Sequence, residues 1–396
     1  MAETAFILDE SYEAIRAAVR EFAQRELAPR AAAYDASGEF PWENVRKLAE
    51  HGYLGMMIPE AYGGGGMDTL AHAICLEEVA RACAATAVVM DVHNSLVGEL
   101  LNRWADEAMK AEWLPLLARG ERLGAFCLTE PDAGSDAAAL KTTAVRDGDH
   151  YVLNGRKTFI SNGGVADVYV VFAVTDPAAG SRGISAFLVE KGTPGLSFGK
   201  PVKKMGIRAS ATTDVVLENV RVPARRLIGR EGQGYKIALA TLDNGRVGIG
   251  AQAVGIAQAA LDRAVAYAAR RRQFGRPIAS FQAIQFKLAD MATEVEAARL
   301  LVYRAASLYD LSVRTGRRAS KEISMAKLFA SEVAMRVTTE AVQIHGGYGY
   351  LQEFEVERLM RDAKITQIYE GTSEVQRLVI ARALLAEAGQ ALEVTA

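Results

Sequence analysis

The stretch YVLNGRKTFISNG, residues 151–163, decides the fold class that the sequence predicts. It places Asn154-Gly155 between two runs rich in β-branched and aromatic residues, and this dipeptide is the strongest short-range signal for a β-hairpin. Further short runs of this kind, VYVVFAV, ISAFLVE and TTDVVLENVRV, are separated by Gly, Pro and Asp residues. Because no segments of helical length lie between these runs, we expect a small antiparallel β-sandwich or barrel rather than a parallel doubly wound sheet.

Helical patterns flank this β-region on both sides. Before it, apolar residues recur at helical spacing, and Pro and Gly residues cluster between the segments. After it, long helical patterns cover residues 235–271, 281–315, 320–345 and the residues from Ser373 onward. Gln376 is the expected capping-box partner of Ser373. We therefore predict an α+β multidomain chain with an N-terminal α-helical domain at 1–122, a middle antiparallel β-domain at 123–234 and a C-terminal helical-bundle domain at 235–396.

The composition is that of a soluble globular protein with more than one domain. The chain has 396 residues, of which 50% are hydrophobic and 24% are charged, and its formal net charge is −2. This balance gives no indication of nucleic-acid or membrane-surface binding. The three cysteines lack C-x-x-C spacing, which predicts buried thiols in a reducing compartment. Since neither a targeting segment nor a run of about 18 uncharged apolar residues is visible, we expect a cytoplasmic protein, or a mitochondrial-matrix protein whose presequence has been removed.

Several common kinds of site are missing from the sequence. The five histidines are far apart and form no H-E-x-x-H or other close ligand pair, so we expect no metal site. Neither a G-x-S-x-G nucleophile elbow nor a Walker loop is present. GIGAQA, residues 248–253, matches the dinucleotide fingerprint, but it lies inside a helical pattern and follows no strand. We interpret it as small residues at a helix crossing, so a nucleotide cofactor would have to bind without a Rossmann domain.

The stretch IYEGTSE, residues 368–374, raises the question of function. Glu370 stands just before a predicted helix, where the ordinary interpretation is a solvated loop residue. Other polar stretches also have ordinary interpretations: a strand connection for FCLTEPDAGSD (126–136), a hairpin end for FISNGG (159–164), and helix ends for RRRQFG (270–275) and QIHGGYGY (343–350). The alternative is that their N–H groups and glycines hold a ligand.

These stretches, in this order, resemble the acyl-CoA dehydrogenase family. The resemblance covers nearly the whole chain and rests on FCLTEPDAGSD, FISNGG, IGREGQGY, RRRQFGRPI, AVQIHGGYGY and RDAKITQIYEGTSEVQRLVIAR. TLDNGRVGIGAQAVG, KEISMAK and EGTSEVQRLVIA are most similar to the short-chain and short-branched-chain members. The resemblance implies a helical N-terminal domain, a middle β-domain and a C-terminal four-helix bundle. It also implies non-covalent FAD, a homotetramer, an acyl-CoA substrate and an electron-transferring flavoprotein as electron acceptor.

The resemblance also implies roles for individual residues. Glu370 would be the base that removes the α-proton of the substrate. The residues that would contact FAD are Phe126, Leu128, Thr129, Phe159, Ser161, Arg271, Phe274, Gln282, Gln343, Gly346, Gly347, Thr372 and Glu374. Among these, Arg271, Phe274, Gln343 and Gly347 would reach the FAD of a neighbouring subunit, and Phe159 stands where many relatives carry Trp. The residues that would contact the acyl-CoA are Ser135, Asp243, Arg246, Tyr369 and Gly371.

Such a site oxidises the acyl group between its α and β carbons. The base takes the α-proton while the β-hydrogen leaves as hydride to the flavin, and a dry pocket raises the pKa of the glutamate from about 4.3 toward neutrality. Some relatives carry the base at the position of Gly245, where a glycine leaves Glu370 as the candidate. Gln252 and Thr366 match positions near the pocket floor of short-chain relatives, so we expect a short or short-branched acyl group.

Two other functions stay open at this point. An acyl-CoA oxidase would pass the electrons from the reduced flavin to O2, and it differs in oxygen access rather than in a sequence motif. A non-catalytic helical scaffold of the same fold would be colourless when purified, whereas the enzyme would be yellow. Fatty-acid β-oxidation, branched amino-acid breakdown and specialised carboxylic-acid catabolism all remain possible pathways.

Overall fold

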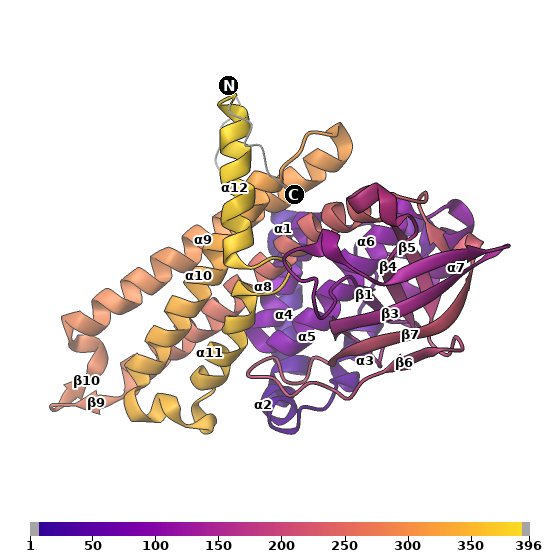
Figure 1. The fold of residues 1–396 in the computed structure, drawn as a ribbon. Helices are drawn as coiled ribbons and strands as arrows, with labels where there is room; N and C mark the ends of the chain where they lie inside the picture. Colours follow the sequence, from indigo (N-terminus) through magenta and orange to yellow (C-terminus); the bar gives the residue numbers. More distant parts are fainter. Residues whose placement is uncertain (1–7, 390–396) are drawn as a thin grey trace.

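The computed structural model describes residues 8–389, and its elements follow the order helices, sheet, helices (Figure 1). The N-terminal helices are α1 (Glu10–Phe22), α2 (Ala28–Ser37), α3 (Trp42–Glu50), α4 (Thr69–Ala82), α5 (Ala84–Asp91), α6 (Glu99–Trp104) and α7 (Glu107–Ala118). The central strands are β1 (Gly124–Cys127), β2 (Thr143–Asp147), β3 (His150–Ser161), β4 (Val168–Val174), β5 (Ile184–Glu190), β6 (Leu196–Phe198), β7 (Thr212–Pro223) and β8 (Leu227–Ile228). The C-terminal elements are α8 (Gly234–Arg270), the short strands β9 (Arg272–Gln273) and β10 (Arg276–Pro277), α9 (Gln282–Thr315), α10 (Ser320–His345), α11 (Val356–Lys364) and α12 (Ser373–Glu387). This arrangement confirms the predicted α+β fold class.

The central strands form one sheet in the order β6-β7-β3-β2-β4-β5-β8, with β1 beside β4. The pairings of β1 and β2 with β4 are parallel, whereas β2–β3, β3–β7, β4–β5, β5–β8 and β6–β7 are antiparallel. Side chains of β4 alternate between two cores, since Val170 and Phe172 face the cluster that contains α7 and the start of α8, while Tyr169 and Val171 face the other strands. The sheet is therefore covered by helices on one face.

The stretch at Asn154-Gly155 does not form the hairpin that the sequence predicts. β3 continues through it, and the β2–β3 turn lies earlier, between Asp147 and His150. The register of β3 against β7 shifts between Leu153 and Gly155, which is a β-bulge. A Cβ atom on Gly155 would lie 2.4 Å from Thr142 Oγ1. The hairpin prediction was wrong because this glycine serves a close backbone approach instead of a turn.

The helical patterns after residue 234 are confirmed in α8, α9, α10 and α12, whereas α11 was not predicted. The predicted capping box of Ser373 and Gln376 was wrong. Thr372 is the N-cap of α12, and its Oγ1 accepts a hydrogen bond from the Val375 N–H at 3.2 Å. The Gln376 amide instead donates to the main-chain carbonyl of Gly371 at 2.9 Å, so it fixes the loop before the helix.

The glycines of GIGAQA lie within α8 and allow close packing of neighbouring elements. A Cβ atom on Gly248 would lie 2.1 Å from Asp91 Oδ1, and one on Gly250 would lie 2.9 Å from Val302 Cγ2. These contacts confirm the interpretation of the motif as small residues at a helix crossing.

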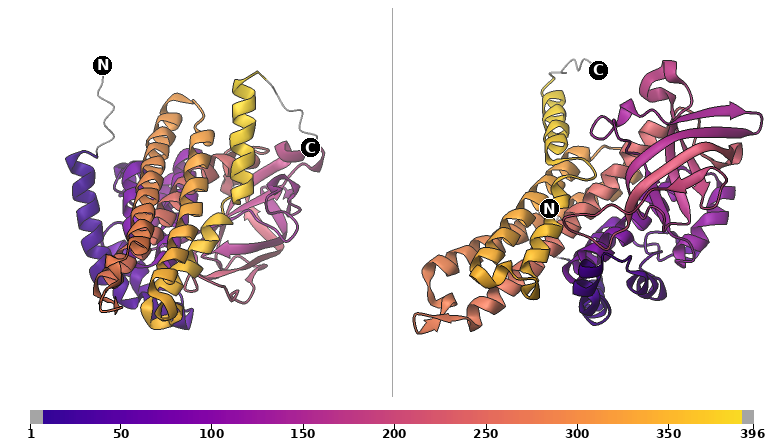
Figure 2. Two further views of the ribbon diagram at one scale, coloured as in Figure 1. Left: turned by 90° about the vertical axis from the view of Figure 1, so that its left-hand side faces the viewer. Right: turned by 60° about the horizontal axis from the view of Figure 1, so that its bottom comes forward.

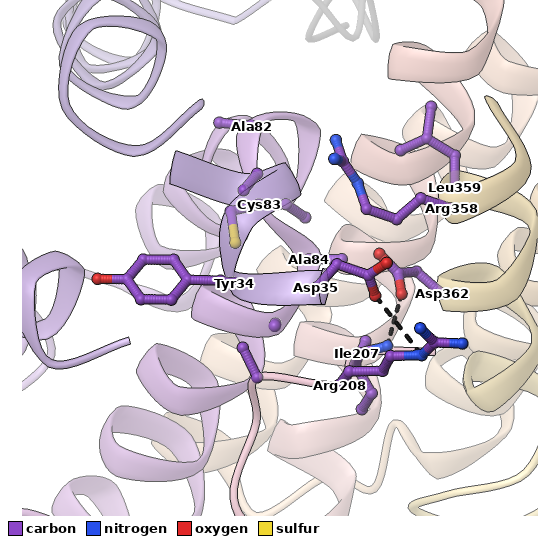
Figure 3. A pocket seen from close by; sticks show the side chains of 14 residues that line it. Tyr34, Asp35, Ala82, Cys83, Ala84, Ile207, Arg208, Arg358, Leu359 and Asp362 are labelled. Atoms are coloured by element: carbon purple, nitrogen blue, oxygen red, sulfur yellow. Dashed lines mark hydrogen bonds and ion pairs between the residues drawn. The ribbon is translucent and has the colours of Figure 1, made fainter. Parts of the chain in front are cut away.

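The N-terminal helices, the sheet region and the C-terminal helices meet at a junction beside α11 (Figure 3). Asp362 of α11 accepts a hydrogen bond from the Ile207 N–H at 2.5 Å. Arg361 of α11 pairs with Asp35 of α2 at 2.6 Å, and Arg208 approaches the same carboxylate. These interactions connect segments that are far apart in the sequence. At the other end of the long helices, the β9–β10 hairpin lies remote from the sheet (Figures 1 and 2).

None of the helices within residues 8–389 combines the length and the apolarity needed to cross a membrane. The same residues contain no group of three or more His, Cys, Asp or Glu side chains placed to hold a metal ion.

Candidate functional site

Glu370 lies in the connection before α12, and its carboxyl group points into the protein. Its backbone φ is 53°, in the left-handed region that non-glycine residues seldom adopt. Its Oε2 atom is buried and has no hydrogen-bond partner. A Cβ atom on Gly245 of α8 would lie 2.0 Å from that oxygen, so the glycine leaves the space that the carboxyl group fills. The ordinary interpretation of Glu370 as a solvated loop residue is therefore wrong.

Polar side chains from α8, α10 and α12 hold the main chain around Glu370. Arg246 Nε donates to the Glu370 carbonyl at 3.3 Å, and Lys327 Nζ donates to the Gly371 carbonyl at 2.7 Å. Arg246 also pairs with Asp243 at 2.8 Å, and Ser320 donates to the second oxygen of that aspartate at 2.6 Å. The loop is thus fixed by its carbonyls, while the Glu370 carboxyl group is left free.

The surroundings of Glu370 favour its protonated form. Burial raises the pKa of Glu370 well above its ordinary value, and the negative charge of Asp91 raises this pKa further. Lys327 and Arg246 act in the opposite direction on the same pKa. Burial also lowers the pKa of Lys327 to about 7. A carboxyl group with these properties is a stronger base than a solvated glutamate.

Tyr369 and the two predicted pocket-floor residues lie on the inner side of this loop. The Tyr369 hydroxyl donates to Gln252 Oε1 of α8, and Gln252 Nε2 donates to the Ala84 carbonyl at 3.1 Å. Thr366 is buried, and its hydroxyl donates to the Ala363 carbonyl at 2.7 Å. The structure therefore connects Gln252 to Tyr369, whereas the hydroxyl of Thr366 is engaged by its own segment.

Residues predicted to contact the flavin ring come together at the ends of β1 and β3. Phe126 belongs to β1, Leu128 and Thr129 follow it, and the Thr158 N–H of β3 donates to the Thr129 carbonyl at 2.9 Å. Phe159 and Ser161 belong to the end of β3. Phe159 is 65% exposed and has a backbone φ of 56°. Ser135 is exposed in the loop that follows Thr129.

A buried ion pair that the sequence did not reveal fixes this loop. Lys157 Nζ of β3 lies 2.7 Å from Glu130 Oε1 and 3.2 Å from the Leu128 carbonyl. Glu130 also accepts hydrogen bonds from the N–H groups of Lys141 and Thr142 at 2.6 and 3.0 Å. Burial opposes the ionisation of Glu130, but Lys157 lowers its pKa below the ordinary value. The pair holds the loop after β1 against β3.

A second group of predicted cofactor residues lies around a cavity of about 440 Å³ at the far end of the long helices. Arg271, Gly346 and Gly347 line this cavity, and the Arg271 guanidinium lies 5.1 Å from the centre of the Tyr348 ring. An added Cβ atom on Gly346 or Gly347 would meet nothing within 4 Å. The glycines therefore border open space.

Phe274, next to this cavity in sequence, is 93% exposed and has a φ of 53°. Gln282 begins α9, and Gln343 is exposed near the end of α10. Thr372 and Glu374 lie at the start of α12, beside Glu370. Within one chain, the structure does not bring the β9–β10 end together with the ends of β1 and β3 (Figure 1).

Two further residues of the Glu370 region were missed by sequence reasoning. Asp91 is 1% exposed and acts electrostatically on Glu370, and Asn244 is 1% exposed with both amide atoms unpartnered. The available signal for Asp91 was a single charge within the apolar run ATAVVMDVHNSLV. Asn244 directly precedes Gly245 and gave no signal of its own.

Comparison with known proteins gives matches along almost the whole chain. Residues 9–121, 125–220 and 232–385 match the N-terminal, middle and C-terminal domain models of acyl-CoA dehydrogenase. The short-chain specific acyl-CoA dehydrogenase of Clostridium acetobutylicum is 50% identical over 375 residues, which cover 95% of this chain and 98% of that protein.

Solved structures agree with this result. The butyryl-CoA dehydrogenase of Megasphaera elsdenii has a TM-score of 0.92 and 47% identity, and the match covers 96% of this chain and 99% of that one. A chain in the structure described as the electron transferring flavoprotein of Acidaminococcus fermentans has a TM-score of 0.93 and 49% identity, with 96% and 99% of the two chains covered.

Proposed function

This chain belongs to the acyl-CoA dehydrogenase family of FAD-dependent oxidoreductases, and from this premise we propose that it oxidises a short-chain or short-branched acyl-CoA to the trans-2-enoyl-CoA. The observation that carries the proposal is the Glu370 carboxyl group, whose Oε2 is buried without a partner above Gly245. A buried carboxyl group without a partner costs stability, so its retention points to a chemical role.

The residues present fit FAD. Gly346 and Gly347 border open space in the cavity that Arg271 lines, and Phe159 and Phe274 expose aromatic faces. In this proposal, Thr129 and Ser161 hold the flavin ring beside Phe159, and Arg271, Phe274, Gln282, Gln343, Gly346 and Gly347 hold the nucleotide half. Thr372 and Glu374 contact the cofactor beside the catalytic residue. When bound, FAD accepts the β-hydrogen of the substrate as a hydride.

Glu370 takes the α-proton of the thioester at Oε2 in the proposed reaction. The α-carbon–hydrogen bond breaks and an oxygen–hydrogen bond forms on the carboxyl group, while the hydride leaves from the β-carbon. The raised pKa of Glu370 suits this step, because the group then holds the proton it has accepted. Gly371 is a proposed contact of the thioester, and its lack of a Cβ atom also admits Gln376, whose Nε2 would lie 2.6 Å from such an atom. Tyr369 helps to exclude water from the carboxyl group.

Asp243, Arg246 and Ser135 are the proposed contacts of the CoA portion. Asp243 bonds to both Ser320 of α10 and Arg246 of α8, and these bonds hold the Asp243 and Arg246 side chains in fixed orientations before any ligand binds. Such preorganisation reduces the entropy lost on binding. Ser135 is exposed in the loop after β1.

The preference for a short acyl group rests on the polar residues beside the base. Gln252 and the Tyr369 hydroxyl bond to each other, which leaves less apolar space next to Glu370 than aliphatic side chains would. Similarity to the short-chain specific protein of Clostridium acetobutylicum and to butyryl-CoA dehydrogenase supports the same preference.

The electron acceptor in this proposal is an electron-transferring flavoprotein, and the assembly is a homotetramer. Similarity to the Acidaminococcus fermentans chain supports the acceptor. Separation of the two groups of cofactor residues within one chain supports an assembly in which neighbouring subunits complete each FAD site.

Anaerobic flavin reduction by a panel of acyl-CoAs tests the proposal. We expect the yellow colour of the oxidised flavin to disappear with butyryl-CoA and short branched acyl-CoAs, and much more slowly with octanoyl-CoA. Rapid reduction that peaks at C8 or longer chains would contradict the substrate preference. Hydrogen peroxide formed stoichiometrically in air would favour the oxidase instead.

A further inference from the structure

Asp91 is a buried carboxyl group to which the proposed reaction assigns no role. It ends α5, directly before the π-helical segment Val92–Gly98, and it is 1% exposed. Its Oδ1 atom accepts a hydrogen bond from Ser95 Oγ at 2.8 Å, whereas its Oδ2 atom is buried without a partner. Such an atom is costly to bury, so the position requires an explanation.

Asp91 and Glu370 pack against the same face of α8. A Cβ atom on Gly248 would lie 2.1 Å from Asp91 Oδ1, and one on Gly245 would lie 2.0 Å from Glu370 Oε2. Cβ positions three residues apart on a helix are about 5–6 Å from each other and point the same way. The two glycines therefore place both carboxyl groups on the same face of α8, about one helical turn apart.

No cation within the described residues forms an ion pair with either carboxyl group. Lys327 donates to the Gly371 carbonyl, and Arg246 is engaged by Asp243 and by the Glu370 carbonyl. Two negative charges this close in a buried place repel each other strongly, and such pairs usually keep one proton between them.

We propose that Asp91 and Glu370 form a carboxyl pair that shares one proton, and that Asp91 is a positioning residue that makes Glu370 a stronger base. This inference rests on the proposed function. To act as the base, the pair first loses this proton, so that both carboxyl groups are ionised. When Glu370 takes the α-proton and the hydride leaves from the β-carbon, the pair again holds one proton and keeps one negative charge. This proton returns to solvent after the product has left.

The electrostatics agree with this geometry. Burial raises the pKa of Asp91 to about 7, against a smaller lowering by Ser95. Burial and then Asp91 raise the pKa of Glu370, while Lys327 from α10 and Arg246 from α8 lower it. Tyr369 adds no charge near neutral pH, because burial raises its pKa well above the ordinary value. Asp91 is thus the anionic neighbour that makes Glu370 harder to ionise.

The pH dependence of flavin reduction in Asp91→Asn tests the inference. With butyryl-CoA under anaerobic conditions, we expect the acid side of the rate profile to move to lower pH by about one to two units, because the repulsion at this distance is removed. The limiting rate at high pH should fall several-fold, since Glu370 becomes a weaker base. Asp310→Asn is the matched control. Burial also raises the pKa of Asp310, to about 6, but its carboxylate bonds Thr69 and does not act on Glu370, so its profile should match the wild type.

Loss of the Asp91 carboxyl group leaves Ser95 satisfied, because its hydroxyl also reaches the Asp91 carbonyl at 2.8 Å. If Asp91→Asn binds FAD normally and keeps the wild-type acid limb, the inference is wrong. If no acyl-CoA reduces the wild-type flavin, the proposed function fails instead.

Infrared titration measures the protonation of the carboxyl groups directly, without enzymatic turnover. The wild type should show a protonated-carboxyl band that titrates near neutral pH, and this midpoint should fall in both Asp91→Asn and Glu370→Gln. Asp91→Ser serves the same purpose if Asp91→Asn does not fold. A midpoint that is unchanged in every one of these variants would overturn the shared proton.

Discussion

Glu370, Phe159 and Phe274 all have a left-handed backbone conformation, with φ values of 53°, 56° and 53°. Non-glycine residues in this region carry a conformational cost of about 1–3 kcal/mol, and they persist where the surrounding structure fixes them. All three belong to the stretches that resemble the acyl-CoA dehydrogenase motifs. In Glu370 the consequence is direct, because the conformation turns the carboxyl group toward α8.

Gly245→Ala tests whether the space above α8 positions the base. The added Cβ atom would lie 2.0 Å from Glu370 Oε2 and 2.7 Å from Leu96 Cδ2, so both side chains should move and some stability should be lost. We expect flavin reduction by butyryl-CoA to slow by roughly 10²-fold, because displacement by about 1 Å disrupts proton transfer. FAD content should stay at the wild-type level.

Gly250→Ala is the matched control on the same helix. Its Cβ atom would meet Val302 Cγ2 at 2.9 Å, away from Glu370, so this variant should lose thermal stability but retain flavin reduction. Equal loss of flavin reduction in the two variants would contradict the positioning role of Gly245.

At the scale of elements, the position of the loop after β1 depends on the ion pair between Lys157 of β3 and Glu130 of the loop. Lys157→Met leaves Glu130 buried without its cation, and breaking such a pair by removing one partner costs about 3–5 kcal/mol. We expect a lower melting temperature and weaker retention of FAD, since Thr129 follows Leu128 in the same loop. Differential scanning fluorimetry and flavin absorbance after gel filtration measure the two effects.

The double variant Lys157→Met with Glu130→Gln separates the effect of an isolated buried charge on stability from the effect of altered packing. Removal of both charges should recover much of the lost stability, because no isolated charge remains buried. If the double variant is as unstable as Lys157→Met, the lost stability does not come from the isolated charge of Glu130.

Elements whose apolar residues recur at a clear helical spacing were predictable from the sequence, whereas contacts between distant segments were not. The long helices α8, α9 and α10 followed from apolar spacing and glycine or proline boundaries. The bulge at Asn154-Gly155 was missed, because the same dipeptide serves both tight turns and close strand contacts. The Lys157–Glu130 pair depends on how β3 meets the loop after β1, which no local pattern encodes.

The candidate site was predictable only in part, for the same reason. Glu370 and Gly245 were identified through a family resemblance, and the structure places them against each other. Asp91 comes from a helix of the N-terminal region, and its proximity to Glu370 arises from the packing of α5 and α8. A single sequence contains no signal for that contact.

At the scale of the whole molecule, the bond between Asp362 and the Ile207 N–H joins the C-terminal helices to the sheet region (Figure 3). The neighbouring Arg361–Asp35 pair joins the same helices to the N-terminal region. Burial raises the pKa of Asp362 to about 6. A carboxyl group whose folded pKa is raised stabilises the fold below its unfolded pKa, and this contribution is lost as the pH rises through the folded value.

Asp362→Asn should remove this pH dependence, because the amide keeps an acceptor for the Ile207 N–H but cannot ionise. We expect the wild type to lose roughly 1–2 kcal/mol of unfolding free energy relative to the variant between pH 5 and pH 8. Urea unfolding at the two pH values measures the difference. A constant difference across this range would contradict the assignment.

The central claim is that Glu370 removes the α-proton, and flavin reduction in Glu370→Gln tests it most directly. Glutamine keeps the shape of the side chain but cannot accept the proton. In an anaerobic stopped-flow experiment with butyryl-CoA, we expect Glu370→Gln to bind FAD at the wild-type level and to reduce its flavin more slowly by roughly three orders of magnitude or more. Flavin reduction at the wild-type rate in this variant would show that Glu370 is not the base.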